Sequence, residues 1–141
     1  MAVFIIRAVE GREDFQFPPD PFFTDVPATH PFFKYIQRMR QLGITAGCSA
    51  TTYCPDDPVT RGQMAVFLVR GRAAIPSGQN VPSPDQPFFT DVPASHPFFQ
   101  FIQEMRQWAV TSGCTASTYC PDSPATRGQM AVFVIRSFFT P

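Results

Sequence analysis

Four cysteines fall in two pairs with the same spacing, Cys48-x5-Cys54 and Cys114-x5-Cys120. Four cysteines allow three pairings, and the repeated spacing favours one local disulfide bond in each pair. Closing so short a loop would stabilise the fold by about 2 kcal/mol if the gain is chain entropy. Zinc is the weaker alternative, because the spacing is wider than a CxxC knuckle and the two histidines lie at the far end of each unit. Disulfide bonds persist in oxidising compartments, so the pairs predict an exported protein.

The other side chains with reactive chemistry stand at turns. His30 and His96 each precede a proline at a predicted helix start, where local capping explains them better than a catalytic or metal role. Asp25 and Asp91 precede Val-Pro, where a carboxylate accepts hydrogen bonds from nearby backbone N–H groups as an Asx-turn; contact with a ligand is the alternative. The sequence contains no phosphate loop, no HExxH motif and no nucleophile with a base. We therefore predict a protein that is not an enzyme, with no cofactor and no catalytic or metal residue.

Two arginines lie at the start of predicted helices. Each occurs in the sequence Thr-Arg-Gly-Gln, at Thr60–Gln63 and at Thr126–Gln129. Threonine followed three residues later by glutamine is a capping box. A helix start favours anions through its N–H groups and dipole, and a guanidinium binds a carboxylate through two hydrogen bonds. Arg61 and Arg127 are therefore candidates to bind an anionic ligand; pairing with a neighbouring acidic residue is the alternative.

These residues belong to a duplicated unit. Residues 21–70 align with residues 87–136 at an offset of 66, with 36 identities in 50 positions. Part of the unit also opens the chain, because MAVFIIR at residues 1–7 matches MAVFLVR at 64–70 and MAVFVIR at 130–136. Phe138-Phe139-Thr140 copies the opening of the unit. Self-similarity of this kind is the signature of a repeat protein.

The duplication divides the chain into six parts. We interpret them as the last helix of a partial repeat (1–10), a linker (11–20), a repeat (21–70), a linker (71–86), a repeat (87–136) and the start of a truncated repeat (137–141). The linkers are rich in proline, glycine and polar residues and are predicted to be exposed connectors without a core. Met1 is then the motif methionine of a longer array, and a true start at Met1 is the alternative. An export signal is expected upstream.

Each complete repeat predicts two helices around the cysteine loop. In the first repeat, Thr29 is expected to cap a helix with apolar residues at three- and four-residue spacing, and Gly43 to end it. The second repeat has Ala109 in place of this glycine, which predicts a looser stop. The MAVF helices are apolar on all sides, so all three are predicted to be buried and to meet in a common core. The expected fold class is mainly α, as tandem helix–loop–helix repeats.

The charge balance restricts the partners. Basic and acidic residues number 11 each, so the net charge is zero. The chain lacks the basic stripe of a nucleic-acid-binding protein and the polybasic cluster of a membrane-surface protein. No apolar stretch approaches the ~20 residues that span a bilayer. We therefore predict no nucleic-acid partner and no membrane-spanning segment.

The combined motifs resemble the S-layer homology (SLH) family. The likeness lies in F-T-D-V-P, an amphipathic helix, G-I-T-A-G and Y-C-P-D-x-P-V-T-R-G-Q-M-A, over residues 22–70 and 88–136 and part of the unit at 1–7. It implies helix–loop–helix units around a pseudo-threefold helical core, and binding to anionic, often pyruvylated, wall polysaccharide. The family motif usually reads T-R-A-E, so the arginine is retained here and the glutamate is not; the paired cysteines are a further departure. The ligand-binding residues that the resemblance implies are Arg61, Arg127, Thr60, Thr126, Asp25 and Asp91.

Two functions are compatible with these observations. The first is a non-catalytic extracellular module that anchors a protein to the cell envelope through anionic cell-wall polysaccharide, with exposed arginines in grooves between repeats. The second is a structural subunit of a surface layer or extracellular filament that assembles with other copies of itself. The out-of-phase ends and the 16 phenylalanines favour the second, because contiguous apolar patches mark interfaces.

Overall fold

The computed structural model describes residues 1–140, and over that range it is built from helices. Its only β-type pairing there is one isolated bridge between Thr60 and Pro124. The helices are α1 (Ala2–Glu10), α2 (Phe33–Gln41), α3 (Arg61–Ala73), α4 (Phe99–Gln107) and α5 (Arg127–Phe138). The predicted mainly α class is confirmed. Pro141, the last residue of the predicted truncated repeat, lies outside the described residues.

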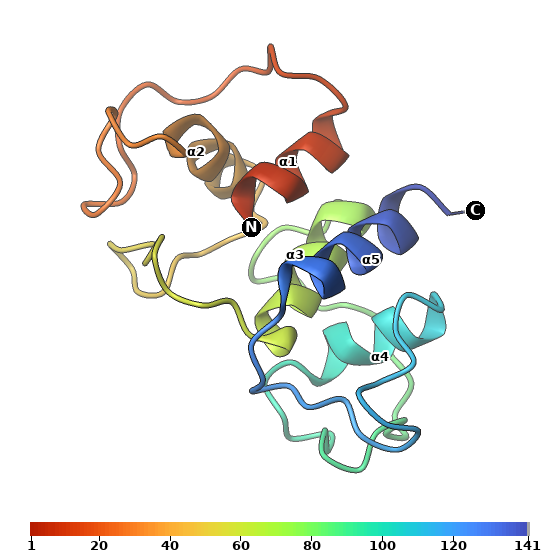
Figure 1. Ribbon diagram of the computed structural model, residues 1–141. Helices are drawn as coiled ribbons and strands as arrows, with labels where there is room; N and C mark the ends of the chain where they lie inside the picture. The colour runs from red at the N-terminus through yellow and green to blue at the C-terminus, as the bar shows by residue number, and fades with distance from the viewer. Residues whose placement is uncertain (141) are drawn as a thin grey trace.

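The three MAVF helices lie together at the centre of the molecule (Figure 1). Helices α1, α3 and α5 contact one another pairwise, α2 packs on α1, and α4 packs on α3. Each outer helix therefore covers the central helix of the repeat before its own. The predicted meeting of the three MAVF helices is confirmed, and a threefold axis stays a prediction.

Burial differs between the central helices although their sequences agree. Val66 and Val69 of α3 are 8% and 0% exposed, whereas the equivalent Val132 and Ile135 of α5 are 45% and 56% exposed. Helix α4 packs on α3, while α5 packs against the two other central helices. The prediction that all three helices would be buried is therefore wrong for α5.

The outer helices begin later than predicted. Helix α2 begins at Phe33 because a His-Pro turn precedes it, and the expected cap at Thr29 is wrong. In this turn Nδ1 of His30 accepts a hydrogen bond from the N–H of Phe32 at 3.1 Å. His96 accepts the same bond in the second repeat. The histidines thus take the local capping role that the sequence favoured.

Both outer helices end at a residue with positive φ. Gly43 has φ 71° and Ala109 has φ 57°. Their N–H groups donate to the carbonyl oxygens of Arg40 and Arg106, both at 3.1 Å. The predicted looser stop in the second repeat is wrong, because alanine adopts the same turn there. Glycine is needed in the first repeat, since a Cβ on Gly43 would lie 2.8 Å from Cβ of Pro76.

The two connectors are anchored to the helices. Phe15 of the first connector is 4% exposed and Val81 of the second is 3% exposed. Most residues of both connectors are exposed, as predicted, but each connector also contributes one apolar side chain to the common interior. Helix α3 also continues to Ala73 and α5 to Phe138, beyond the predicted ends of the repeats.

Candidate functional site

Each cysteine pair closes its own loop. The disulfide bonds join Cys48 to Cys54 and Cys114 to Cys120, and no cysteine is free. The predicted local pairing is confirmed. The zinc alternative is wrong, because all four sulfur atoms are bonded to one another in pairs. We call the two closed segments the first and second cysteine loops.

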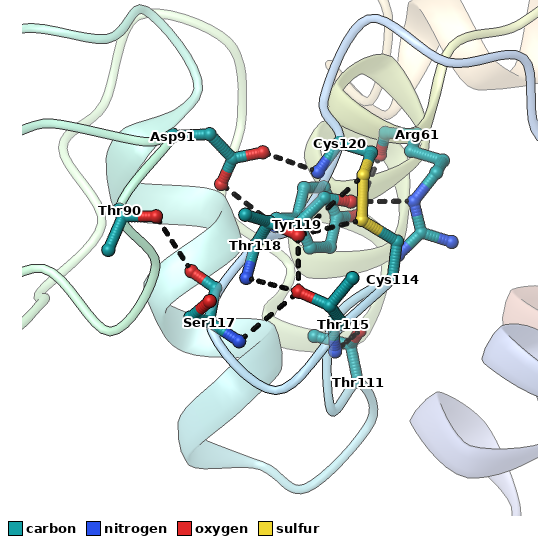
Figure 2. Close-up of a disulfide and its surroundings, with 11 residues drawn as sticks. Arg61, Thr90, Asp91, Thr111, Cys114, Thr115, Ser117, Thr118, Tyr119 and Cys120 are labelled. Carbon is teal, nitrogen blue, oxygen red and sulfur yellow. Dashed lines mark hydrogen bonds between the residues drawn. A yellow bond between two sulfur atoms is a disulfide. The ribbon is translucent and has the colours of Figure 1, made fainter.

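Asp25 and Asp91 hold these loops to the openings of their repeats. The carboxylate of Asp25 accepts hydrogen bonds from the N–H groups of Tyr53 (2.9 Å) and Cys54 (2.7 Å). Asp91 makes the same two bonds in the second repeat, at 2.8 and 2.7 Å (Figure 2). Burial raises the pKa of Asp25, but the two backbone donors outweigh it and bring this pKa below its usual range. The expected local Asx-turn is wrong, because the donors lie 28 and 29 residues away.

Both predicted capping boxes are present. The hydroxyl of Thr60 accepts from the N–H of Gln63 at 3.2 Å, and the Gln63 side chain accepts from the N–H of Thr60 at 3.0 Å. Thr126 and Gln129 form the same pair at the start of α5. Both threonine hydroxyls are thus engaged within the helix starts.

The first of the two arginines is buried against the second cysteine loop. Arg61 is 4% exposed, its Nε donates to the carbonyl oxygen of Tyr119 at 2.8 Å, and its guanidinium lies 4.7 Å from the Tyr119 ring centre (Figure 2). The Tyr119 hydroxyl donates back to the carbonyl oxygen of Arg61 at 2.8 Å. The N–H groups of Arg61 and Gly62 donate to the carbonyl oxygens of Ser123 (2.9 Å) and Pro121 (2.8 Å). The expectation of an exposed arginine is wrong for Arg61.

A groove of about 380 Å³ lies beside Arg61, between α5 and residues 111–113, which lead into the second cysteine loop. We call it the second groove; its wall includes Arg61, Thr111, Gly113, Gln129, Phe133 and Arg136. Nη2 of Arg61 is buried and has no hydrogen-bond partner within residues 1–140. The guanidinium of Arg136 is the other cation in this wall, and no carboxylate of residues 1–140 lines it. Two cations without an acid make the second groove suited to an anionic ligand.

The other arginine is exposed at the edge of a larger groove. Arg127 lines a groove of about 460 Å³ between α1 and the first cysteine loop, which we call the first groove. Thr45 and Gly47 line it as Thr111 and Gly113 line the second groove. The two grooves therefore occupy corresponding places in the two repeats.

Comparison with known families identifies the repeats that form these grooves. The sequence model of the S-layer homology domain matches residues 22–65 and 88–131, which together make up more than half of the chain. The chain belongs to the S-layer homology family. SLH repeats are non-catalytic modules that anchor surface proteins to the cell wall, so the chain is a module of the cell surface or envelope. The disulfide bonds make it a variant with paired cysteines.

Two larger proteins contain a similar segment. One is an endoglucanase from Bacillus sp. (strain KSM-635), 29% identical over 138 residues. The other is a cell surface protein from Thermoanaerobacter kivui, 29% identical over 115 residues. These matches cover 98% and 82% of this chain but only 14% and 15% of the two proteins. The SLH chain thus spans about a seventh of the length of either relative.

The structure adds residues that sequence reasoning missed. Tyr119 is fully buried under Arg61, and burial raises the pKa of its hydroxyl, which keeps it a hydrogen-bond donor. The signal was available, because a tyrosine precedes the second cysteine of both SLH repeats. Arg136 ends the third MAVF segment, where no sequence pattern marks it as a groove residue. Within residues 1–140, no helix is both long enough and apolar enough to cross a membrane.

Proposed function

We propose that this SLH module binds acidic cell-envelope polysaccharide in the second groove and so anchors the protein that carries it. The observation that supports this proposal is the buried Nη2 of Arg61, which has no partner among the described residues. A buried donor without an acceptor costs free energy, and a ligand that supplies an acceptor recovers it. A sugar carboxylate, as in a pyruvyl group, has two oxygens that match a guanidinium.

The surroundings of Arg61 prepare it for this role. Tyr119 fixes the guanidinium by a hydrogen bond and by its ring, so little side-chain freedom is lost on binding. Arg136 adds a second cation to the same wall, and the helix start of α5 adds its dipole. The groove thus combines one rigid cation, one exposed cation and a favourable helix end.

The test is co-sedimentation with cell-wall preparations that retain their acidic polysaccharide, compared with preparations from which it has been stripped. We expect Arg136→Gln to weaken binding about tenfold, because a hydrogen bond to a charged group contributes about 1.5–3 kcal/mol. Arg106→Gln is the matched control, since Arg106 is also exposed but does not line the second groove.

A second variant addresses the buried arginine. Arg61→Lys keeps the charge and loses the planar donor set, so we expect weaker binding. The melting temperature should also fall, because lysine cannot replace the bond from Nε to the Tyr119 carbonyl oxygen, so binding is compared at a temperature where both proteins are folded. Unchanged binding in both Arg136→Gln and Arg61→Lys would remove the second groove from the mechanism. Equal binding to stripped walls would remove the polysaccharide.

A further inference from the structure

Gln129 belongs both to the cap of α5 and to the wall of the second groove. Its Oε1 accepts a hydrogen bond from the N–H of Thr126 at 3.2 Å, and its own N–H donates to the Thr126 hydroxyl at 3.1 Å. Nε2, the other polar atom of this exposed side chain, makes no hydrogen bond within residues 1–140. The cap therefore uses the oxygen of the side chain and leaves its nitrogen available to a ligand.

The place of this glutamine at a groove is repeated in the other unit. Gln63, the corresponding residue of the first repeat, forms the same capping box and lines the first groove. Helix α4 packs on α3, and Gln63 is nevertheless exposed. Packing of an outer helix therefore leaves this position open, so a capping glutamine that faces a groove is a feature of each repeat.

The cap itself does not require glutamine. A capping box forms equally with glutamate, because the bond from the N-cap N–H needs only a side-chain oxygen. Glutamate would also gain from the positive end of the helix dipole. Glutamine gives up this gain and instead brings a neutral side chain with an amide N–H to the groove wall. The effect of Gln129 therefore lies in the charge of the groove rather than in the stability of α5.

The charge of the second groove comes from two arginines. Nη2 of Arg61 is buried without a partner among the described residues, and Nη1 of Arg136 donates to the carbonyl oxygen of Val110 at 3.4 Å. Neither arginine forms an ion pair within residues 1–140, where no carboxylate lines the groove. Gln129→Glu would offset one of these two positive charges. Two guanidinium groups and one amide donor suit a ligand with two acidic groups.

We propose that Gln129 is a specificity-determining residue of the second groove. It caps α5 without adding a negative charge, so the groove takes a saccharide segment with two acidic groups, one at Arg61 and one at Arg136. The amide of Gln129 donates a hydrogen bond to the same segment. This inference rests on the proposed function, because it concerns the ligand of the same groove.

Titration calorimetry of Gln129→Glu with acidic polysaccharide released from the wall tests this role. We expect the affinity to fall about fivefold, because like charges a few ångströms apart repel even in a solvated groove. The melting temperature should stay the same or rise. The matched control is Gln63→Glu, which makes the same change in the same kind of cap outside the second groove and should leave the affinity unchanged. An unchanged affinity in Gln129→Glu, or an equal loss in both variants, overturns the proposal.

Partial methyl esterification of the polysaccharide measures how many acidic groups one site needs. The number of parent chains bound at saturation should fall with the square of the fraction of free carboxyl groups, because each site requires two of them. In Arg136→Gln the number should fall in proportion to that fraction, since one cation remains for one acid. A proportional fall with the parent chain would mean that one acidic group suffices, and the proposal would be wrong.

The two proposals can fail separately. If Arg136→Gln weakens binding and Gln129→Glu does not, the second groove is the binding site but Gln129 does not select the ligand, and only the present inference is wrong. If Arg136→Gln, Arg61→Lys and Gln129→Glu all leave the affinity unchanged, the polysaccharide binds elsewhere on the module and both proposals are wrong.

Discussion

Helices α3 and α5 begin alike, with Thr-Arg-Gly-Gln-Met-Ala-Val-Phe, and meet different surroundings. Arg61 and Gly62 are buried by α4 and the second cysteine loop, whereas Arg127 and Gly128 are exposed. The sequence of a repeat therefore determines which side chains of its helix could be buried. Contact with the neighbouring repeat determines which of them are buried. This is the expected behaviour of repeat proteins, whose stability comes from both the units and the interfaces between them.

The apolar face of the two helices gives the largest expected difference. We expect Val69→Ala to lower the free energy of unfolding by about 2–3 kcal/mol, because Val69 is fully buried and its truncation leaves a cavity. Ile135→Ala, at the equivalent exposed position, should cost less than about 1 kcal/mol. Urea unfolding at low protein concentration measures both. Equal losses would mean that α5 is covered in solution and that the comparison fails.

Replacing glycine by alanine should change the stability of the fold in opposite directions at the two helix starts. A Cβ on Gly62 collides with Phe98, so Gly62→Ala should destabilise the fold by about 1–3 kcal/mol. The nearest atom to a Cβ on Gly128 is Oγ1 of Thr126 at 3.9 Å. Gly128→Ala should therefore stabilise the fold by about 0.5–1 kcal/mol through helix propensity.

Thermal melting of the two glycine variants sharpens the comparison, because the substitution is the same. A stabilising Gly62→Ala would show that the contact between α3 and Phe98 is loose in solution. A destabilising Gly128→Ala would show instead that α5 needs glycine for a contact that the monomer does not display.

Features that depend on residues close together in the sequence could be predicted from it. The capping boxes at Thr60 and Thr126, the stop at Gly43 and the local disulfide bonds depend on neighbours along the chain. The burial of Arg61 could not be predicted, because its partner Tyr119 lies 58 residues away. The donors to Asp25 are likewise distant. Its carboxylate was expected to form a local turn, but it joins the opening of the repeat to the cysteine loop.

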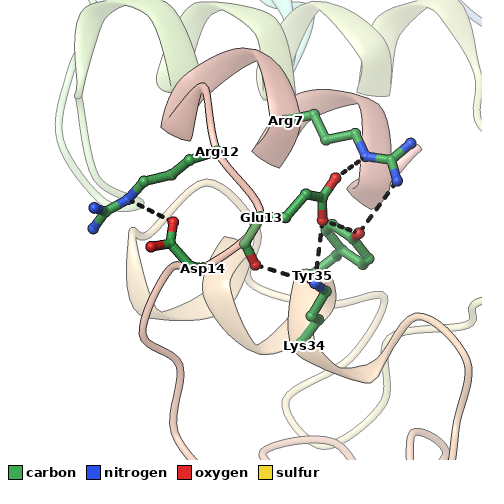
Figure 3. A network of polar contacts seen from close by, with 6 residues as sticks. All are labelled: Arg7, Arg12, Glu13, Asp14, Lys34 and Tyr35. Carbon is green, nitrogen blue, oxygen red and sulfur yellow. Dashed lines mark hydrogen bonds and ion pairs between the residues drawn. The ribbon is translucent and has the colours of Figure 1, made fainter.

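The connectors provide a second comparison within the molecule. Glu13 of the first connector accepts hydrogen bonds from Tyr35 (2.6 Å) and Lys34 (3.1 Å) and pairs with Arg7 (Figure 3). In the second repeat, phenylalanine and glutamine replace the tyrosine and lysine, so this cluster has no counterpart. The second connector is held instead by Val81, which is buried and donates to the side chain of Gln100 at 3.3 Å. Only the first connector should therefore depend on pH.

As the pH falls, the contacts that hold the first connector should weaken before those that hold the second. Hydrogen bonds from Tyr35, Arg7 and Lys34 lower the pKa of Glu13 to about 2. Because the folded-state pKa lies below the unfolded value of 4.5, the stabilisation is complete above pH 4.5 and is lost as the pH falls towards 2.

We expect the difference in melting temperature between the parent chain and Glu13→Gln to be present at pH 6 and to vanish near pH 2. The difference should be small, because the cluster is exposed and screened by solvent. Other titrating groups, Asp25 included, are common to both proteins and cancel from the difference. Asp14→Asn, which alters only an exposed ion pair with Arg12, is the control and should show no such dependence. A Glu13→Gln difference that is constant from pH 6 to pH 2 would mean that the charge of Glu13 does not hold the first connector. Its anchors would then be the buried Phe15 and the hydrogen bonds from the Gln37 side chain to the carbonyl oxygens of Pro18 and Asp20.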